Sequence, residues 1–186
     1  GLLQEAEMRR REIEGMLVGF ARRAEVYPQI LYLGVDGKVI VRIRDGRAAP
    51  PGAEALDPET LRALKSLRPG RRYAGDIRRA PWHPAPLIRY GMVLYDEAGR
   101  PRGSLVFDCS LASVYATLGR LQIGLSGRSY LTQREERPSP YGSPRRYDHW
   151  VTASAVVPGT PWSIVSSVNR DEFLDRLQPI RLATIM

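Results

Sequence analysis

The sequence predicts an α+β fold: a five-stranded antiparallel sheet with flanking helices, followed by a smaller, reduced second α/β module. The first observation is a long amphipathic helical pattern over residues 2–26, ahead of the first strand. The second is a pair of short apolar runs, 30–35 and 39–43, joined at Asp36-Gly37, a dipeptide typical of tight β-hairpins. The third is the element order: a helix, two strands, a helix and three strands favour an antiparallel sheet with helices on its faces.

Composition places the chain among globular proteins and narrows its partners. Of the 186 residues, 43% are hydrophobic, which is enough for a sizeable core. The formal net charge is +8, and every basic residue except Lys38 and Lys65 is an arginine. Because these arginines are scattered along the chain, no nucleic-acid partner is predicted. The sequence has no apolar stretch of about 20 residues for a membrane span. Its single cysteine, Cys109, lies in an apolar run that predicts a packing role.

The leading helix carries apolar residues at alternating steps of three and four, which is the helical period. They are Leu3, Ala6, Ile13, Leu17, Phe20 and Ala24. Arg10 interrupts this stripe, and Pro28 ends the helix. The stripe fits packing against the protein's own sheet, and it fits equally well a seam with a second copy of the chain.

The rest of the first module follows in order. The stretch after Arg44 is rich in Gly and Pro and is predicted to be a loop. A short helix comes next, with Asp57 as its cap and Pro58 in its first turn. Three more strands complete the sheet, at 72–77, 87–95 and 103–108. Ser110 is predicted to cap the helix that follows them.

The second module is predicted to be smaller. Its strands are expected at 128–133, 150–157 and 162–168. A polar, proline-rich loop over 134–147 separates the first two strands. A last helix is predicted to begin at Asp171 and to continue to about Leu182.

Four stretches carry a resemblance to a known family. They are ILYLGVDGKVIVRI, RRYAGDI, LIRYGMVLYDEAGRPRGSLVFDCSLASVYATL and PWSIVSSVNRDEFLDRL. In these stretches, and in the long helix before them, the chain resembles the extracytoplasmic double Cache sensor domains of bacterial sensor histidine kinases, diguanylate cyclases and chemoreceptors. The strand, turn, strand and leucine-rich helix of residues 87–118 form the most specific piece.

The resemblance implies a domain organisation and a location. It divides the chain into an N-terminal signalling helix at 1–27, a membrane-distal PAS-like module at 28–120, a reduced membrane-proximal module at 121–169, and a helix toward the membrane at 170–186. Both ends of the chain stop within helical patterns, so we expect a fragment of a longer, membrane-anchored protein. The fragment itself would be extracytoplasmic, in the periplasm.

The resemblance also implies sensing without catalysis. Such a domain binds a small molecule and passes a conformational change through its terminal helices, and a sensor histidine kinase is the expected parent. The alternative is an interaction module without a small ligand, which senses a periplasmic partner or forms a homodimer through helix 2–26. His83 and His149 lack a metal-ligand spacing, and no nucleophile or phosphate-loop motif is present. We therefore expect no enzyme, no metal and no cofactor.

Six residues form the predicted ligand site. In PAS-like folds the ligand lies between one face of the sheet and the segment that crosses it, here 46–86. The candidates are Tyr73, Asp76, Trp82, Arg89, Tyr90 and Asp108. Arg89 beside aromatic walls would suit a carboxylate, and Asp108 would suit an amine or a hydroxyl.

The polar candidates have structural alternatives. Arg89 and Arg42 would also fit as solvent-facing strand residues, and Asp108 would fit as the end of its strand. Amino-acid-binding members of the family carry an Arg-x-Trp signature ahead of a later Asp. No such signature precedes Asp108 in the expected place, because Trp82 lies in a proline-rich loop. A carboxylate ligand therefore fits the sequence, whereas an amino acid has no support from this signature.

Overall fold

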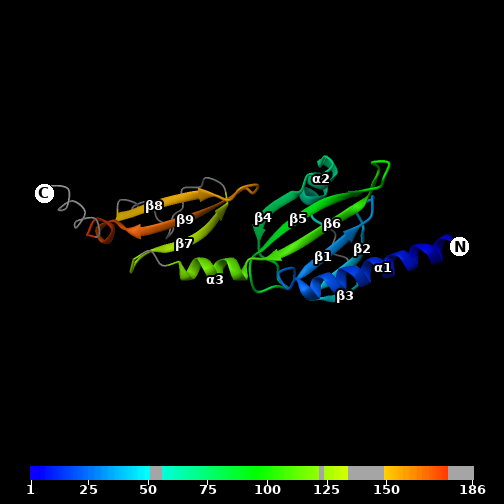
Figure 1. The fold of residues 1–186 in the computed structure, drawn as a ribbon, viewed down its shortest axis with the longest axis horizontal. Helices are drawn as coiled ribbons and strands as arrows, with labels where there is room; N and C mark the ends of the chain where they lie inside the picture. The colour runs from blue at the N-terminus through cyan, green and yellow to red at the C-terminus, as the bar shows by residue number, and fades with distance from the viewer. Residues whose placement is uncertain (51–55, 122–123, 134–148, 176–186) are drawn as a thin grey trace. The chain divides into compact units, whose positions relative to one another are not determined.

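The computed structural model describes residues 1–50, 56–121, 124–133 and 149–175, in two compact units that divide between Leu111 and Ala112 (Figure 1). The first unit contains α1 (Leu2–Arg23), β1 (Gln29–Leu33), β2 (Val39–Arg44), β3 (Arg47–Ala49), α2 (Pro58–Ser66), β4 (Tyr73–Arg78), β5 (Leu87–Tyr95) and β6 (Pro101–Ser110). The second contains α3 (Ala112–Arg120), β7 (Arg128–Gln133), β8 (Trp150–Val156) and β9 (Trp162–Asn169). The predicted α+β class, with one large and one smaller antiparallel sheet, is confirmed.

The first unit is built on an antiparallel sheet with strand order β3-β2-β1-β6-β5-β4, one strand more than predicted. The additional strand is β3, which forms where the sequence predicted a loop. Asp45 and Gly46 have positive φ angles of 50° and 70°, as a two-residue type I′ hairpin turn requires. This turn folds β3 back onto β2, with Arg47 opposite Arg44.

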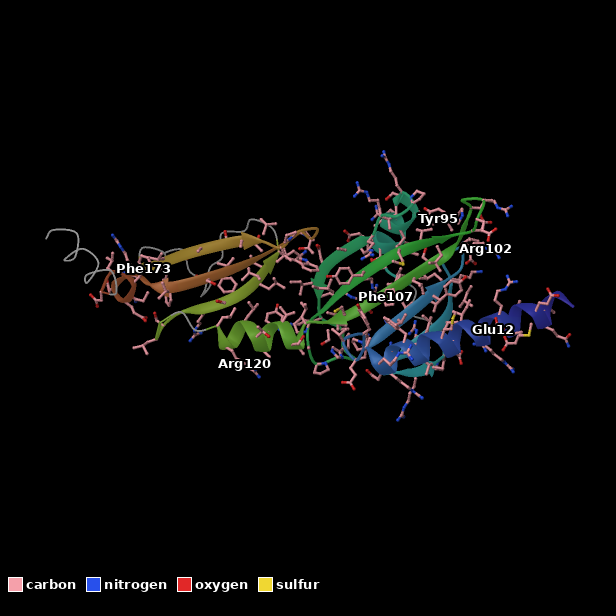
Figure 2. The ribbon with its side chains drawn as sticks, viewed as in Figure 1. Glu12, Tyr95, Arg102, Phe107, Arg120 and Phe173 are labelled. Carbon is pink, nitrogen blue, oxygen red and sulfur yellow. The ribbon has the colours of Figure 1, made fainter. Side chains whose placement is uncertain are left out.

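Helix α1 covers one face of this sheet (Figure 1). The apolar cluster between the helix and the sheet consists of Ala21 of α1 with Ile30, Val41 and Ile43 of the strands. Ile13, Leu17 and Val18 of α1 pack against this cluster. Phe20 and Tyr27 stack at 5.7 Å, and Phe107 of β6, labelled in Figure 2, contacts both rings. Burying a valine or isoleucine side chain completely, as at Ile30, Val41 and Ile43, stabilises the fold by roughly 1.5–3 kcal/mol for each residue. Ile13 and Leu17 of the apolar stripe therefore pack against the protein's own sheet, whereas Leu3 at its start is 89% exposed.

Helix α2 packs against the opposite face of the sheet. Side chains alternate between the two faces along each strand, so the same strands supply a second apolar cluster on that face. The cluster on this side contains Leu31, Leu33, Leu56, Leu64 and Val106. Gly91 of β5 lies beneath α2, and a Cβ there would stand 2.6 Å from Leu64 Cδ2, so the glycine permits the close approach of the helix. Asp57 caps α2 as predicted: its carboxylate accepts hydrogen bonds from the Thr60 amide at 2.7 Å and the Thr60 hydroxyl at 2.9 Å.

The second unit has a sheet with strand order β7-β9-β8. The central strand β9 buries Trp162, Val165 and Val168. Residues 170–175 begin a helix, as the sequence predicts. The predicted loop 134–147 and the continuation of that helix to Leu182 lie outside the described residues.

A carboxylate fastens the start of this last helix to a turn of the same unit. Glu172 accepts hydrogen bonds from the backbone amides of Leu125 at 2.5 Å and Ser126 at 3.0 Å, and from the Ser126 hydroxyl at 2.5 Å. The Ser126 hydroxyl oxygen in turn accepts from the amide of Asn169 at 3.0 Å. These bonds fix the position at which the chain leaves β9.

Some predicted boundaries differ from those of the structure. Helix α1 belongs to the first unit, Gly1–Leu111, rather than standing apart from the membrane-distal module. It ends at Arg23, earlier than the predicted residue 26, because the chain turns at Ala24, whose carbonyl accepts from the amide of Tyr27. Helix α3, which the sequence analysis assigned to the first module, groups with the second unit. Ser110 is the last residue of β6 and not a helix cap.

Candidate ligand-binding site

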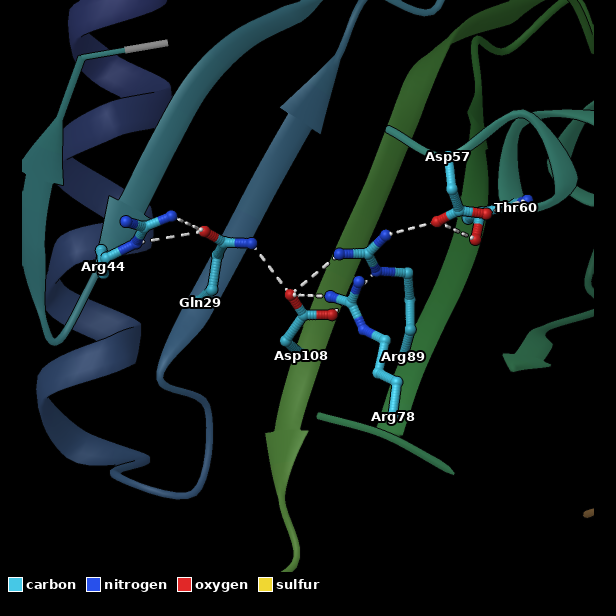
Figure 3. Close-up of polar contacts among 7 residues, drawn as sticks. All are labelled: Gln29, Arg44, Asp57, Thr60, Arg78, Arg89 and Asp108. Atoms are coloured by element: carbon cyan, nitrogen blue, oxygen red, sulfur yellow. Dashed lines mark hydrogen bonds and ion pairs between the residues drawn. The ribbon is translucent and has the colours of Figure 1, made fainter. Parts of the chain in front are cut away.

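A row of polar side chains crosses the α2-facing side of the sheet, beside the apolar cluster. Strand pairing places Arg44, Gln29, Asp108 and Arg89 next to one another on β2, β1, β6 and β5 (Figure 3). Polar groups at the centre of a sheet destabilise the fold unless they are hydrogen-bonded. The partners of each group therefore determine what it contributes to the site.

Asp108 lies at the centre of this row, and its side chain has no exposed surface. Oδ1 accepts from Arg89 Nε at 2.8 Å. Oδ2 accepts from Arg89 Nη2 at 3.0 Å, Arg78 Nη2 at 2.6 Å and Gln29 Nε2 at 2.8 Å. Two guanidinium groups compensate the buried negative charge. A carboxylate offers about four acceptor positions, and Asp108 accepts four hydrogen bonds from side chains of the protein itself.

Arg89 connects the sheet to the start of α2. Its side chain is 6% exposed, and its Nη1 donates to Asp57 Oδ2 at 2.8 Å. Partial burial acts to raise the pKa of Asp57, but the hydrogen bonds from Thr60 and the charge of Arg89 outweigh it and hold that pKa below the ordinary 3.8. Arg89 is thus a buried ion-pair residue between two carboxylates, a role that neither sequence alternative described.

Gln29 continues the network toward the loop before β5. Its amide nitrogen donates to Asp108, while its amide oxygen accepts from Arg44 Nε at 3.3 Å and Nη2 at 2.8 Å. The Arg44 guanidinium lies 4.6 Å from the centre of the Trp82 ring, a cation–π contact. One connected set of side chains therefore extends from Trp82 to Asp57.

A cavity of about 230 Å³ lies between this row and residues 78–82, and we call it the arginine cavity. Its polar lining comes from Gln29, Arg42, Asp57, Arg78, Arg79 and Arg89, and its apolar lining includes Leu31, Leu56 and Trp82. The volume lies below the range of about 300–1,000 Å³ for drug-sized ligands, which favours a small metabolite. Because four arginines line it, its potential favours anions.

A second cavity of about 510 Å³, the outer cavity, shares Asp57, Arg78 and Arg89 with the first. Tyr73 and Asp76 of β4 also line it. Asp76 lies where the pairing between β4 and β5 is irregular, and it is exposed. The outer cavity is therefore wider and less uniformly basic than the arginine cavity.

The structure brings some of the predicted site residues together and separates others. Trp82 and Arg89 line the arginine cavity, and Asp108 is bonded directly to Arg89. Tyr73 and Asp76 line only the outer cavity. Tyr90 pairs across the sheet with Phe107, on the α1 side, so it faces away from the site. Burial there raises the pKa of its hydroxyl.

Six polar contributors to the site lie outside the predicted set. They are Gln29, Arg42, Arg44, Asp57, Arg78 and Arg79. One available signal lay in the β2 sequence VIVRIR, where Arg42 and Arg44 occupy every second position of an otherwise apolar strand. Such a period places both on one face, and Arg42 is only 5% exposed.

Other reactive groups do not form a second centre in the described residues. No group of His, Cys, Asp and Glu side chains in this part of the chain is arranged to hold a metal ion. Cys109 is half-buried, and burial raises the pKa of its thiol, which disfavours the reactive thiolate. Among the described helices, none combines the length and the apolar character that crossing a bilayer requires.

Solved structures that are similar to this chain include several sensory domains. The extracellular domain of a protein assigned as histidine kinase vpHK1S-Z8 matches with a TM-score of 0.67 and 17% identity over 89% of this chain and 79% of that one. A domain of a Vibrio parahaemolyticus protein assigned to the sensory box/GGDEF family matches with a TM-score of 0.62 and 17% identity, over 90% and 81% of the two chains. The sensory domain of the Campylobacter jejuni chemoreceptor Tlp3, with isoleucine bound, gives 0.62 and 14%, over 89% and 75%.

These similarities establish the fold. The chain has the architecture of extracellular sensory domains of histidine kinases, GGDEF proteins and chemoreceptors, as the resemblance to double Cache domains predicts. No protein-family model matches the sequence, and no curated protein sequence does. The assignment of a function therefore depends on the site as well as on the fold.

Proposed function

We propose that this chain is the extracytoplasmic ligand-sensing domain of a membrane-anchored signalling receptor of the sensor histidine kinase class. The observation that supports this most strongly is the arginine cavity, a small basic cavity walled by Arg42, Arg78, Arg79 and Arg89. The shared fold supports it independently, since the Tlp3 sensory domain holds isoleucine. The proposal assigns binding, and no catalysis, to this chain.

The walls of the cavity suggest how binding would be transmitted. Arg42 on β2 faces the cavity, while its neighbours Val41 and Ile43 pack on the α1 side of the same strand. Arg89 joins β5 to the cap of α2 through Asp57. An anion that draws Arg42 and Arg89 toward itself would change forces on both helices. The anion would favour the conformation of the domain that binds it more tightly. The size of this shift cannot exceed the difference in the anion's binding free energy between the two conformations.

A thermal-shift screen tests the proposal. The compounds are small carboxylates, amino acids, polyamines and nucleobases. A ligand at about 100 times its dissociation constant adds about 2.7 kcal/mol to the free energy of unfolding. That free energy raises the melting temperature of a chain this size by roughly 5–10 °C.

Two matched variants show where a stabilising compound binds. Arg79→Gln removes an exposed guanidinium that lines the cavity, and Arg72→Gln removes an exposed guanidinium that lies outside the lining. We expect the shift to fall in the Arg79→Gln chain alone. A screen in which no compound stabilises the protein, or equal shifts in both variants, would contradict the proposal.

A second candidate is a dimerisation module, favoured by the outer surface of α1. Met8 and Met16 are exposed at 61% and 67%, and a Cβ at Gly15 would meet nothing within 4 Å. A contact surface between helices commonly combines exposed apolar side chains with a glycine that lets the second helix approach closely. Sedimentation velocity tests it: a concentration-dependent dimer that Met16→Glu abolishes would support it. A monomer at every concentration up to about 100 μM would exclude all but very weak association.

A further inference from the structure

We propose that the arginine cavity selects small organic acids that carry no ammonium group and discriminates against the amino acids with the same carbon skeleton. This inference rests on the proposed function and names the chemical class of its ligand. It follows from how the protein uses its own carboxylates around the cavity.

The carboxylate that would receive an ammonium group is already occupied. Asp108 accepts four hydrogen bonds, from Arg89, Arg78 and Gln29, and its side chain has no exposed surface. An ammonium group would have to displace a guanidinium from Asp108 and leave that guanidinium without its partner. Exchanging one cation for another in this way brings no net gain.

The second carboxylate is mostly occupied as well. Asp57 accepts from the amide and the hydroxyl of Thr60 and from Arg89 Nη1. It holds the first turn of α2, so recruiting it for a ligand would remove the cap of that helix. Asp108 therefore has no acceptor position left for a positively charged group, and the three donors to Asp57 leave about one position on a carboxylate that is 46% exposed, where water competes for it.

The charge of the lining favours the same ligand class. Among the described residues that line the cavity, four are arginines and Asp57 is the one carboxylate. Arg89 has used three of its five N–H groups on Asp57 and Asp108, so two remain on the guanidinium for a bound anion. An ammonium group in this cavity would be desolvated beside positive charges, and Asp57, already bonded to Thr60 and Arg89, is the one lining carboxylate that could accept from it.

Two further carboxylates, Asp76 and Glu59, line the outer cavity, and both are exposed. Water and salt therefore screen their charges and weaken any pairing with an ammonium group. We therefore expect the replacement of a ligand hydrogen by an ammonium group to lower affinity by roughly tenfold or more.

Isothermal titration calorimetry with matched pairs of compounds tests the inference on the whole chain. The pairs are propionate and L-alanine, succinate and L-aspartate, and glutarate and L-glutamate. In each pair the two compounds differ by one ammonium group on the same skeleton. We expect at least one acid to bind, with an affinity roughly tenfold or more above that of its amino acid. We also expect Arg79→Gln, but not Arg72→Gln, to weaken that binding.

The outcomes separate this inference from the function on which it rests. An amino acid that binds as tightly as its acid, or more tightly, overturns the inference and leaves ligand sensing in place. Loss of that amino-acid binding in Asp76→Asn would locate the ammonium group in the outer cavity. Binding of no compound in any pair also overturns the inference, and the wider thermal-shift screen then decides whether the domain senses a small molecule at all.

Discussion

Replacing Asp108 by Asn removes the charge at the centre of the polar row and keeps the shape of the side chain. The side chains of Asp108 and Arg89 are 0% and 6% exposed, so water reaches neither of them to compensate. The amide of Asn would also present donors toward the donors of Arg89, Arg78 and Gln29. Removing one partner of a buried ion pair costs about 3–5 kcal/mol. Arg89 then keeps Asp57 as its carboxylate partner, which is 46% exposed, so we expect the loss at the lower end of this range.

Differential scanning calorimetry measures this loss. For a chain of this size, 3–5 kcal/mol corresponds to a fall in melting temperature of roughly 6–20 °C. The matched control is Asp36→Asn, the same chemical change at an exposed hairpin turn, which we expect to leave the melting temperature unchanged. Arg89→Gln alone and combined with Asp108→Asn should give a coupling free energy of about 1–3 kcal/mol, since both changes break the same bonds.

If Asp108→Asn lowers the free energy of unfolding by less than about 1 kcal/mol, Asp108 behaves like a member of an exposed ion pair and not of a buried one. Additive effects of Asp108→Asn and Arg89→Gln would equally show that the two side chains do not act as one buried pair.

Three further predictions test the packing and the caps. Gly91→Ala forces a Cβ to within 2.6 Å of Leu64 and should cost about 1–3 kcal/mol in urea denaturation, whereas Gly119→Ala, with nothing within 4 Å, should be neutral or slightly stabilising. Asp57→Ala should cost about 1 kcal/mol at neutral pH. The pKa of Asp57 lies below 3.8 in the folded chain, so its contribution to stability is present above about pH 4 and is lost as the pH falls through the folded pKa. The unfolding free energies of the parent and the Asp57→Ala variant should therefore converge in acid. Glu172→Gln should lower the unfolding free energy of the second unit by about 1–2 kcal/mol and speed hydrogen exchange at the two backbone amides that it accepts from.

Local signals in the sequence were enough for most of the fold. Asp36-Gly37 between two apolar runs predicts a hairpin, and Asp57 before Pro58 predicts the start of α2; both are present. The strand β3 escaped prediction because Arg47-Ala48-Ala49 has no apolar run to mark it as a strand. Its signal was the dipeptide Asp45-Gly46, whose positive φ angles let two short segments pair.

The candidate site was less accessible to sequence reasoning, because it depends on strand order. Asp108 contacts Gln29 only because β1 lies between β2 and β6 in the sheet, and the chain order of the strands does not give that arrangement. The face of β5 that carries Arg89 was also undetermined, so Tyr90 was included although it lies on the other side. Alternation along β5 excludes one of these two neighbours from the site, and packing decides which.

The residues that pair with Arg89 were undetermined for a similar reason. Two roles for Arg89 fit the sequence, a ligand clamp or a solvent-facing residue. The structure shows Arg89 in a buried pair with Asp108 and in a second, half-exposed pair with Asp57, and the two carboxylates come from different parts of the chain. Long-range ion pairs of this kind depend on the registry of strands and on the position of α2. A single sequence therefore identifies the charged residues of the site but not their partners.

Fluorine NMR of the chain labelled with fluorotryptophan tests most directly whether a ligand occupies the arginine cavity. Trp82 lines that cavity, whereas Trp150 and Trp162 lie in the second unit. Trp82→Phe assigns the resonance of Trp82, and the titrant is the acid with the largest thermal shift. We predict that the Trp82 resonance moves saturably, with the dissociation constant found by calorimetry. A Trp82 resonance that stays in place while the acid saturates the protein would show that the ligand binds elsewhere and would contradict this account.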